Sequence, residues 1–329
     1  MSTHAQTAAL AGAARIAGFA PSIHNTQPWR WRVDGSSLEL RAERERQLAV
    51  TDPVGRLLTI SCGTALHHAR LALAAEGWAA VVHRLPEDAE PDLLARLTLT
   101  GRVDVTPEAM RLLQTIRIRH TDRRPVSETP VAPAALSALR RAGEAEGARI
   151  HVLGPDDVVE LASAAAHAQD VEAVDSSWTE ELSYWAGGVR AEGLGVPDDA
   201  IPSRAPATTV PGRDFGHGGA LPVGEGHDRS AVYAILYGDE DSPTGWLRGG
   251  EALSAVWLAA MELDLTVLPL SAAVEVPGTR RTLRRMLADL GEPYLVLRIG
   301  VGDPEHAGPP HTPRLPAEQV VEVVGDAGI

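Results

Sequence analysis

The sequence predicts an α+β protein whose single chain contains two related halves, residues 1–114 and 115–329. Alternating runs typical of strands and longer amphipathic runs typical of helices are interspersed in both halves. Residues 63–73 align without gaps on residues 250–260, with Gly, Ala and Leu at matching positions. Since any two Ala- and Leu-rich helices align about this well, the alignment gains weight only together with the motifs described below.

The first half is expected to begin with an alanine-rich helix and a two-stranded hairpin. Two alternating runs flank Asp34-Gly35, a pair of residues that favours a tight turn. A second helix is expected after a turn at residues 51–56, because apolar side chains from Leu66 to Leu73 recur at helical spacing. The expected elements are helices 7–18, 61–76 and 106–114 and strands 29–33, 37–42, 78–85 and 97–103.

The second half is expected to contain more helix and one long irregular segment. Its expected helices are 133–146, 156–175, 178–190, 249–263 and 279–290, and its expected strands are 148–153, 231–237 and 294–300. Residues 193–228 are rich in Gly and Pro and show no periodicity. Irregular segments of this length are usually lids, binding loops or disordered regions. We expect a lid over residues 185–228, and Pro-rich coil after the last strand.

Composition limits the partners and the compartment. The formal net charge is −14, which argues against nucleic acid as a partner but not against a phosphate in a local basic pocket. No apolar run is long enough to cross a membrane, and no Lys or Arg precedes Arg15 as a secretory signal would require. With Cys62 as its only cysteine, the chain suits a reducing cytoplasm. All 30 Lys and Arg residues are Arg, which excludes lysine-based catalysis.

The stretch between the first expected helix and the first expected strand is unusually polar. It places a Ser, an Asn, a Thr and a Gln between Pro21 and Pro28. The two prolines fix the backbone, so the polar side chains are held in place. Preorganised donors and acceptors suit a polar ligand, whereas a plain turn would use them to bond its own backbone. Composition alone favours the plain turn.

The same stretch resembles the nitroreductase family of FMN-binding oxidoreductases. In that family a Pro-Ser-x-x-Asn-x-Gln-Pro-Trp loop reaches across a dimer interface to the flavin. The matching residues here are Pro21, Ser22, Asn25, Gln27, Pro28 and Trp29. The resemblance implies a nitroreductase-like fold, in which the helix repeated at residues 63 and 250 lies at the dimer interface. Two copies in one chain then imply a fused, intramolecular pseudo-dimer.

Each half lacks what the other supplies. The family's Arg-x-Ser/Thr-x-Arg/Lys motif holds the flavin phosphate and the pyrimidine end of the ring. The first half has no such motif, whereas residues 119–123, Arg-His-Thr-Asp-Arg, resemble it. Alone, this run also fits a solvated basic turn. Where a second Pro-Ser loop would stand, the chain has only Gly143 to Gly147. The resemblance therefore implies one FMN between the halves, as in the Acg-type branch of the family.

The resemblance also assigns roles to the residues of this run. Arg119 would hold the phosphate dianion of FMN, a group that the arginine fork binds well. Arg123 would lie at flavin N1 and O2, where a fixed cation favours the negative charge of the reduced ring. Thr121 would bond the ribityl chain or the pyrimidine edge, and His120 belongs to the same cofactor-binding run.

Two further arginines are candidates for the cofactor site. Arg314 lies in a segment that resembles the family's C-terminal phosphate-binding segment, although a solvated tail residue explains it equally well. Arg298 lies on an otherwise apolar strand and must be paired with something. The histidines show no metal-ligand spacing and no Cys-x-x-Cys motif exists, so no metal is expected. Cys62 is expected to be a packed small residue rather than a reactive thiol.

The main functional hypothesis is an FMN-dependent oxidoreductase that passes electrons from NAD(P)H to a nitro compound, a quinone or a similar small molecule. The flavin would carry the chemistry, so no side-chain nucleophile is required. The alternative is an FMN-binding or storage protein whose lid leaves no room for nicotinamide. A third hypothesis is a biosynthetic dehydrogenase that uses the same flavin oxidatively, and no residue distinguishes it from the main hypothesis. Tyr184, Trp185, Phe215 and His217 are candidate contacts of the ring or substrate, although packing explains each of them as well. A pseudo-dimer is expected to be monomeric.

Overall fold

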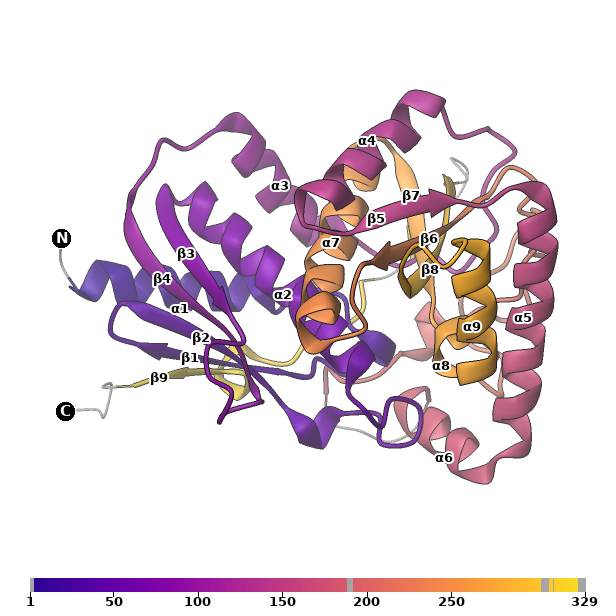
Figure 1. Cartoon of the computed structure of the whole chain (residues 1–329), viewed down its shortest axis with the longest axis horizontal. Coiled ribbons are helices and arrows are strands. Elements are labelled where there is room, and N and C mark those ends of the chain that lie inside the picture. Colours follow the sequence, from indigo (N-terminus) through magenta and orange to yellow (C-terminus); the bar gives the residue numbers. More distant parts are fainter. Residues whose placement is uncertain (1–2, 188–191, 303–307, 310, 325–329) are drawn as a thin grey trace.

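The computed structural model describes residues 3–187, 192–302, 308–309 and 311–324 (Figure 1). Two sheets flanked by helices lie side by side, the sheet of the first half on the left of the figure and that of the second half on the right, while the C-terminal end of the chain returns to the left. The helices α2 and α7 run next to each other between them. No helix in the described part of the chain is both long and apolar enough to cross a bilayer.

The first half forms a sheet that packs on two helices. Its elements are α1 (Thr3–Ala17), β1 (Trp29–Asp34), β2 (Ser37–Ala42), α2 (Arg56–Ala75), β3 (Trp78–Arg84), β4 (Leu93–Arg102) and α3 (Pro107–Ile118). The strands lie in the order β3-β4-β2-β1. A fifth strand, β9 (Val321–Val323), pairs in parallel with β1. The tail that was expected to be coil therefore contains a strand, and this strand extends the sheet of the first half.

The second half forms a four-stranded sheet with more helices around it. Its elements are α4 (Pro133–Ala145), β5 (Arg149–Val152), α5 (Pro155–Val174), α6 (Ser176–Trp185), β6 (Val232–Gly238), α7 (Pro243–Met261), β7 (Leu265–Leu270), α8 (Ala272–Glu275), α9 (Pro277–Met286) and β8 (Glu292–Val301). The strand order is β5-β6-β8-β7. The α+β fold class predicted from the sequence is confirmed.

The two sheets have the same strand order when their elements are matched along the chain. Matching β1 to β5, β2 to β6, β3 to β7 and β4 to β8 converts β3-β4-β2-β1 into β7-β8-β6-β5. All pairings within these two sets of strands are antiparallel. The second half differs by two insertions, from α5 to residue 231 and from α8 to α9. The repeated helices α2 and α7 occupy equivalent places in the two halves.

Helices α2 and α7 cross backbone to backbone at their aligned glycines. A Cβ added to Gly63 would lie 2.1 Å from the carbonyl oxygen of Leu247. One added to Gly250 would lie 2.0 Å from the carbonyl oxygen of Ile60. Ile60 and Leu247 are themselves equivalent, since each stands three residues before its glycine. Reciprocal contacts between equivalent positions are a property of two-fold interfaces.

Buried charges join the same two helices. Glu251 on α7 is fully buried and accepts hydrogen bonds from Arg70 Nη1 at 2.8 Å and from Arg84 Nε at 2.7 Å. His67 on α2 bonds Ser254, the residue aligned with it, with 2.8 Å between Nδ1 and Oγ. Both arginines belong to the first half and Glu251 belongs to the second. A buried carboxylate without partners would cost several kcal/mol, so these pairs favour one fixed arrangement of the halves.

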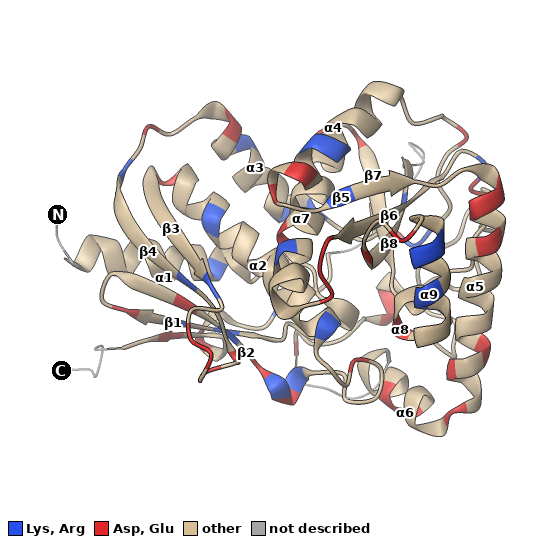
Figure 2. Cartoon of the chain, viewed as in Figure 1, with Lys and Arg blue, Asp and Glu red and all other residues tan. Residues whose placement is uncertain are grey.

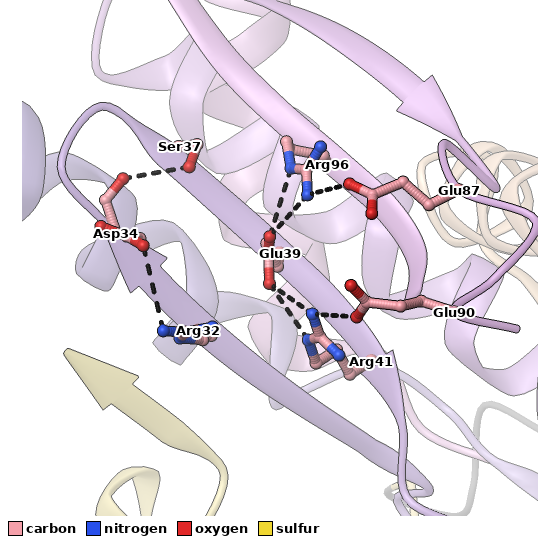
Figure 3. Close-up of polar contacts among 8 residues, drawn as sticks. All are labelled: Arg32, Asp34, Ser37, Glu39, Arg41, Glu87, Glu90 and Arg96. Atoms are coloured by element: carbon pink, nitrogen blue, oxygen red, sulfur yellow. Dashed lines mark hydrogen bonds and ion pairs between the residues drawn. The ribbon is translucent and has the colours of Figure 1, made fainter. Parts of the chain in front are cut away.

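The outer face of the first sheet is covered by ion pairs rather than by another layer. On β2, Leu38 and Leu40 belong to the core with α1 and α2. Glu39, which lies between them, instead accepts hydrogen bonds from Arg41 and Arg96, and each arginine also reaches a second glutamate (Figure 3). Figure 2 shows that acidic and basic residues are interspersed over both halves.

Boundaries differ from the expected ones for local reasons. Helix α2 begins at Arg56 rather than at residue 61, because the carboxylate of Asp52 accepts the N–H groups of Arg56 and Leu58 and so caps the first turn. A strand was expected soon after the repeated helix at residue 250, but without bounds, since six apolar-rich residues directly after a helix give no separate signal. Strand β7 lies at this place. The helix expected at 178–190 ends at Trp185, and residues 188–191 lie outside the described residues.

Candidate functional site

Residues 18–28, which join α1 to β1, form a strained loop that is fixed on α2. His24, Asn25 and Gln27 have positive φ angles of 44°, 54° and 47°, which residues other than Gly rarely adopt. Ser61 and Thr64 on α2 hydrogen-bond backbone groups of this loop, at 3.1 and 2.7 Å. Strained backbone of this kind persists where the surroundings determine it, and it is common at binding sites.

Two adjoining cavities open beside this loop. The larger has a volume of about 610 Å³ and is walled by the loop, α2, α5, α7, the expected lid and the junction of β7 with α8. The smaller has a volume of about 260 Å³ and lies between the loop, the end of α3 and residues 311–314. Both cavities are lined by Pro21, Ser22, His24, Thr121 and Arg123. One cofactor-sized ligand could therefore occupy parts of both.

The smaller cavity is lined by two arginines with incomplete hydrogen bonding, the buried Arg119 and the half-buried Arg314. Among the described residues, Nε and Nη1 of Arg119 and Nε of Arg314 have no partner, and neither guanidinium forms an ion pair. Burial and the charge of Arg314 lower the pKa of Arg119 to about 9, and burial lowers the pKa of Arg314 to about 10. Desolvated cations with free donors are completed by a dianion such as a phosphate.

Arg123 lies where the two cavities meet. Its Nη1 donates to the carbonyl oxygen of Ala200 at 3.0 Å, and its guanidinium carbon lies 5.4 Å from the centre of the Phe215 ring. Burial lowers the pKa of Arg123 to about 10, although the charge of Asp122 acts in the opposite direction. The carboxylate of Asp122 forms an ion pair with Arg124 at 2.7 Å, so it neutralises the positive charge of Arg123 at the junction of the two cavities only in part.

Comparison with known proteins identifies relatives over almost the whole chain. No protein-family model matches it. The protein acg of Mycobacterium tuberculosis H37Rv, provisionally named an NAD(P)H nitroreductase, is 34% identical over 98% of this chain and 97% of its own length. Rv3131 of the same strain, named in the same way, is 36% identical over 93% of this chain and 89% of its own length. The chain belongs to the nitroreductase family, in its Acg-type branch.

More distant relatives and structures are similar in part. Rv3127, an uncharacterized protein of the same strain, is 32% identical over 95% of this chain and 93% of its own length. The solved structure of the FMN-dependent nitroreductase NfnB from Mycobacterium smegmatis with NADPH is 14% identical, with a TM-score of 0.40, over 64% of this chain and 97% of that chain. Membership of the family follows from acg and Rv3131.

In this nitroreductase-family chain, two polar residues of the family loop are hydrogen-bonded to other segments of the described protein. Asn25 lines only the smaller cavity, and its Nδ2 donates to carbonyl oxygens of Gly193 at 3.0 Å and of Pro313 at 3.1 Å. Gln27 lines neither cavity: its Nε2 donates to the Gly193 carbonyl, and its Oε1 accepts the N–H of Leu315 at 2.9 Å. Their amides thus fix the start of the expected lid and the C-terminal segment to the loop.

The remaining candidates are divided between the cavities and the protein interior. Arg119 and His120 line the smaller cavity, whereas Thr121 and Arg123 line both. Arg298 touches the larger cavity, but its Nη1 donates to Asp228 Oδ2 at 2.9 Å and its Nη2 to two backbone carbonyls. The partner that this buried arginine required is therefore Asp228, the last residue of the expected lid.

Sequence reasoning did not name His24, Trp257 or Arg213, which line the larger cavity. His24 stands inside the family loop, Trp257 inside the repeated helix and Arg213 inside the expected lid, so the position of each was an available signal. Trp257 lies under Arg119, with 4.6 Å from its ring centre to the guanidinium carbon. Among the aromatic candidates, Phe215 and His217 line the larger cavity, and Tyr184 and Trp185 line neither.

Other side chains give no sign of separate chemistry. Cys62 is buried with its Sγ 3.2 Å from the carbonyl oxygen of Pro28, and burial raises the pKa of its thiol. A thiol of that kind is a poor nucleophile. Within the described residues, no group of three or more His, Cys, Asp or Glu side chains could hold a metal ion.

The expected lid is fixed over the larger cavity by a buried ion-pair cluster. Arg213 of this segment donates to Glu172 on α5 at 2.7 Å and to Glu275 on α8. The second carboxylate oxygens, Oε1 of Glu172 and of Glu275, are buried without a partner among the described residues, and the two carboxyl groups are within hydrogen-bonding reach. One shared proton would give both oxygens a partner. Burial, together with the Glu275 charge, raises the pKa of Glu172 to about 7.

This cluster predicts a pH-dependent lid. The usual pKa of glutamate is about 4.3, so between about pH 4.3 and pH 7 the closed lid binds a proton that an open lid releases. The closed form is thus most stable below this window and loses that stability as the pH rises to about 7. We expect hydrogen exchange of residues 193–228, corrected for its intrinsic pH dependence, to be at least tenfold faster at pH 8 than at pH 4.5.

The substitution Glu172→Gln tests this cluster. A neutral amide can donate to Glu275 at every pH, so exchange in the variant should stay slow at pH 8. The matched control is Glu180→Gln on α6, where the side chain is exposed. A pH dependence that persists unchanged in Glu172→Gln would show that the carboxyl pair does not control the lid.

Proposed function

We propose that this chain is an FMN-dependent oxidoreductase of nitroreductase type, with one FMN bound between the two halves. The observation that carries the proposal is the pair of arginines that line the smaller cavity, the buried Arg119 and the half-buried Arg314, each with a donor that has no partner among the described residues. A phosphate dianion would complete their hydrogen bonds and offset the cost of their burial. The residues fit FMN for a second reason: the adjoining cavity begins at Thr121 and Arg123, where the ring system would follow the ribityl chain.

The protein residues would bind and orient the cofactor and exclude water from it. Bound FMN would supply the two-electron chemistry, and this is the usual division of work in flavoenzymes. Pro21 and Ser22 come from the first half, and Thr121 and Arg123 come from the second, so the site is complete only where the halves meet. We propose NAD(P)H as the electron donor and a nitro compound, a quinone or a similar small molecule as the acceptor.

We infer further that the chain is an intramolecular pseudo-dimer. The equal strand order of the two sheets and the reciprocal contacts of Gly63 and Gly250 support this proposal. In the first half, the loop 18–28 joins α1 to β1, whereas at the equivalent place in the second half only three residues separate α4 from β5. The second half therefore has no loop that could form a second site of the same kind. We expect one FMN per chain and a monomer by light scattering. We also expect the protein to act in a reducing cytoplasm, without nucleic acid or membrane partners.

An absorbance spectrum tests the function. The protein is purified with FMN, desalted, and titrated with NADPH without oxygen. Flavin bands that survive desalting at one FMN per chain and bleach with NADPH are the expected result. A protein that retains no flavin would overturn the proposal.

A storage protein is the second candidate, and the position of the expected lid favours it. The Ala200 carbonyl receives a hydrogen bond from Arg123, and Arg213 of the same segment is paired with two glutamates. A lid held at both points would limit access of nicotinamide to the ring. Retained flavin that bleaches with dithionite but not with NADPH would favour storage over turnover.

The substitution Arg123→Met should make the midpoint potential of bound FMN more negative by some tens of millivolts. A cation near N1 and O2 stabilises the reduced ring, and about 30 mV corresponds to 1.4 kcal/mol for a two-electron couple. Dye equilibration measures the potential. The control is Arg117→Met, an exposed arginine at the edge of the smaller cavity. Equal midpoint potentials in wild type and Arg123→Met would show that Arg123 does not lie at the flavin ring.

A further inference from the structure

The larger cavity continues beyond the junction at Arg123 to side chains of helix α5. This helix lies at the outer edge of the second half (Figure 1). We call this extension the distal arm. It is lined by buried or half-buried apolar side chains from α5, the expected lid, β7 and α8, namely Leu161, Ala165, Val210, Leu270 and Ala272. None of the residues assigned to FMN belongs to it.

Three polar side chains beside the distal arm already have partners within the described protein. Gln169 Nε2 donates to the Gly212 carbonyl at 2.8 Å, and Thr208 Oγ1 donates to the Val210 carbonyl at 2.8 Å. Arg213 is paired with its two glutamates. A charged ligand group against the apolar walls of the arm would lose its water without gaining an ion pair from Arg213, which is costly.

The two ends of the combined cavity thus have opposite chemistry. The smaller cavity offers unpaired cations, and the distal arm offers apolar walls. We propose that the distal arm binds an apolar substituent, an alkyl or prenyl chain, of an uncharged electron acceptor. This inference rests on the proposed function and names its substrate class: a lipophilic quinone rather than a small charged or polar acceptor. The chain fills the arm, and the quinone ring remains at the junction.

The affinity of the FMN-loaded protein for a series of 2-alkyl-1,4-naphthoquinones, from methyl to decyl, tests the proposal. Quenching of tryptophan fluorescence, without any electron donor, measures the dissociation constants. Each buried methylene should tighten binding about three- to fourfold until the arm is full, after which affinity should level off. An affinity that does not change with chain length would overturn the proposal.

Two variants on one helix separate the arm from non-specific hydrophobic binding. Ala165→Leu narrows the arm, so affinity should level off at a shorter chain while the methyl compound binds as in wild type. Ala166→Leu, at an exposed position of α5 outside the cavity, should leave the whole series unchanged. If Ala165→Leu fails to fold, Ala272→Leu narrows the same arm from α8. A chain-length series that is identical in wild type and the narrowed variant would place the chain elsewhere and overturn the proposal.

The same samples report separately on the proposed function. Flavin retention and bleaching by NADPH are recorded before each titration. Flavin that NADPH does not bleach contradicts the oxidoreductase, and the chain-length series still decides whether the arm binds apolar groups. If NADPH bleaches the flavin normally but the affinity does not depend on chain length, only the proposal for the distal arm is overturned.

Discussion

Replacing Arg119 by Met is expected to weaken FMN binding about 100-fold and, in the same protein, to raise the melting temperature of the FMN-free form. The loss of affinity follows from removing the charge-assisted contact that we propose between Arg119 and the phosphate. Such hydrogen bonds contribute about 1.5–3 kcal/mol, and a factor of ten in affinity corresponds to about 1.4 kcal/mol. Fluorescence titration of the FMN-free protein with FMN gives the dissociation constants.

The gain in stability follows from the pKa of Arg119, which burial lowers to about 9 in the folded protein, well below the ordinary value that the side chain keeps in the unfolded chain. Between these values the unfolded chain binds more protons than the folded one, so stability rises with pH across that window. At pH 7 both states are charged, and the full penalty for burying the cation is present. Removing the charge should therefore stabilise the FMN-free protein by a few kcal/mol.

The two effects have opposite signs, so melting curves should cross. Without FMN the Arg119→Met protein should melt several degrees above wild type, and with saturating FMN wild type should melt higher. The control is Arg111→Met on α3, the helix that ends just before Arg119. The Arg111 side chain is exposed and forms an ion pair of 3.6 Å with Glu262, so its loss should change neither property. A variant that binds FMN normally would contradict the phosphate role, and a lower melting temperature without FMN would contradict the burial penalty.

The parts that could be predicted from the sequence depend on local patterns. The loop at Pro21 and the run at Arg119 are short motifs, and each is close to the same pair of cavities. Helix α7 and its copy α2 were visible because apolar residues recur at helical spacing over many turns. The alignment that joined Gly63 to Gly250 was weak evidence, but the structure places these two residues against each other.

The parts that could not be predicted depend on contacts between distant positions. Gln27 bonds Leu315 across 288 residues, and no pattern around either residue indicates it. Strand β9 has only three residues and is stabilised by its pairing with β1, so its own propensity gives no signal. The cluster at Arg213 needs two carboxylates from helices α5 and α8, each of which reads by itself as an ordinary solvated residue.

The substitution Gly250→Ala is expected to destabilise the protein by at least about 3 kcal/mol, at the upper end of the range for overpacking. The new methyl group would lie 2.0 Å from the carbonyl oxygen of Ile60 and 2.8 Å from Cα of Gly63. Both atoms are backbone of α2, so no side chain can turn away, and the helices must separate. Glu251 directly follows Gly250, so separation of the helices also stretches its ion pairs with Arg70 and Arg84.

The reciprocal geometry makes this prediction sharper. Gly63→Ala should cost about as much as Gly250→Ala, because its Cβ would lie 2.1 Å from the carbonyl oxygen of Leu247. The double variant should cost less than the sum, since the first methyl group already separates the helices at the same crossing. Urea unfolding measures all three, and Gly278→Ala in α9, where an added Cβ meets nothing within 4 Å, serves as the control. The prediction fails if the two single variants lose very different amounts of unfolding free energy, or if their losses add fully in the double variant. Either result would show that the crossing is not a two-fold contact and would remove the main support for the pseudo-dimer.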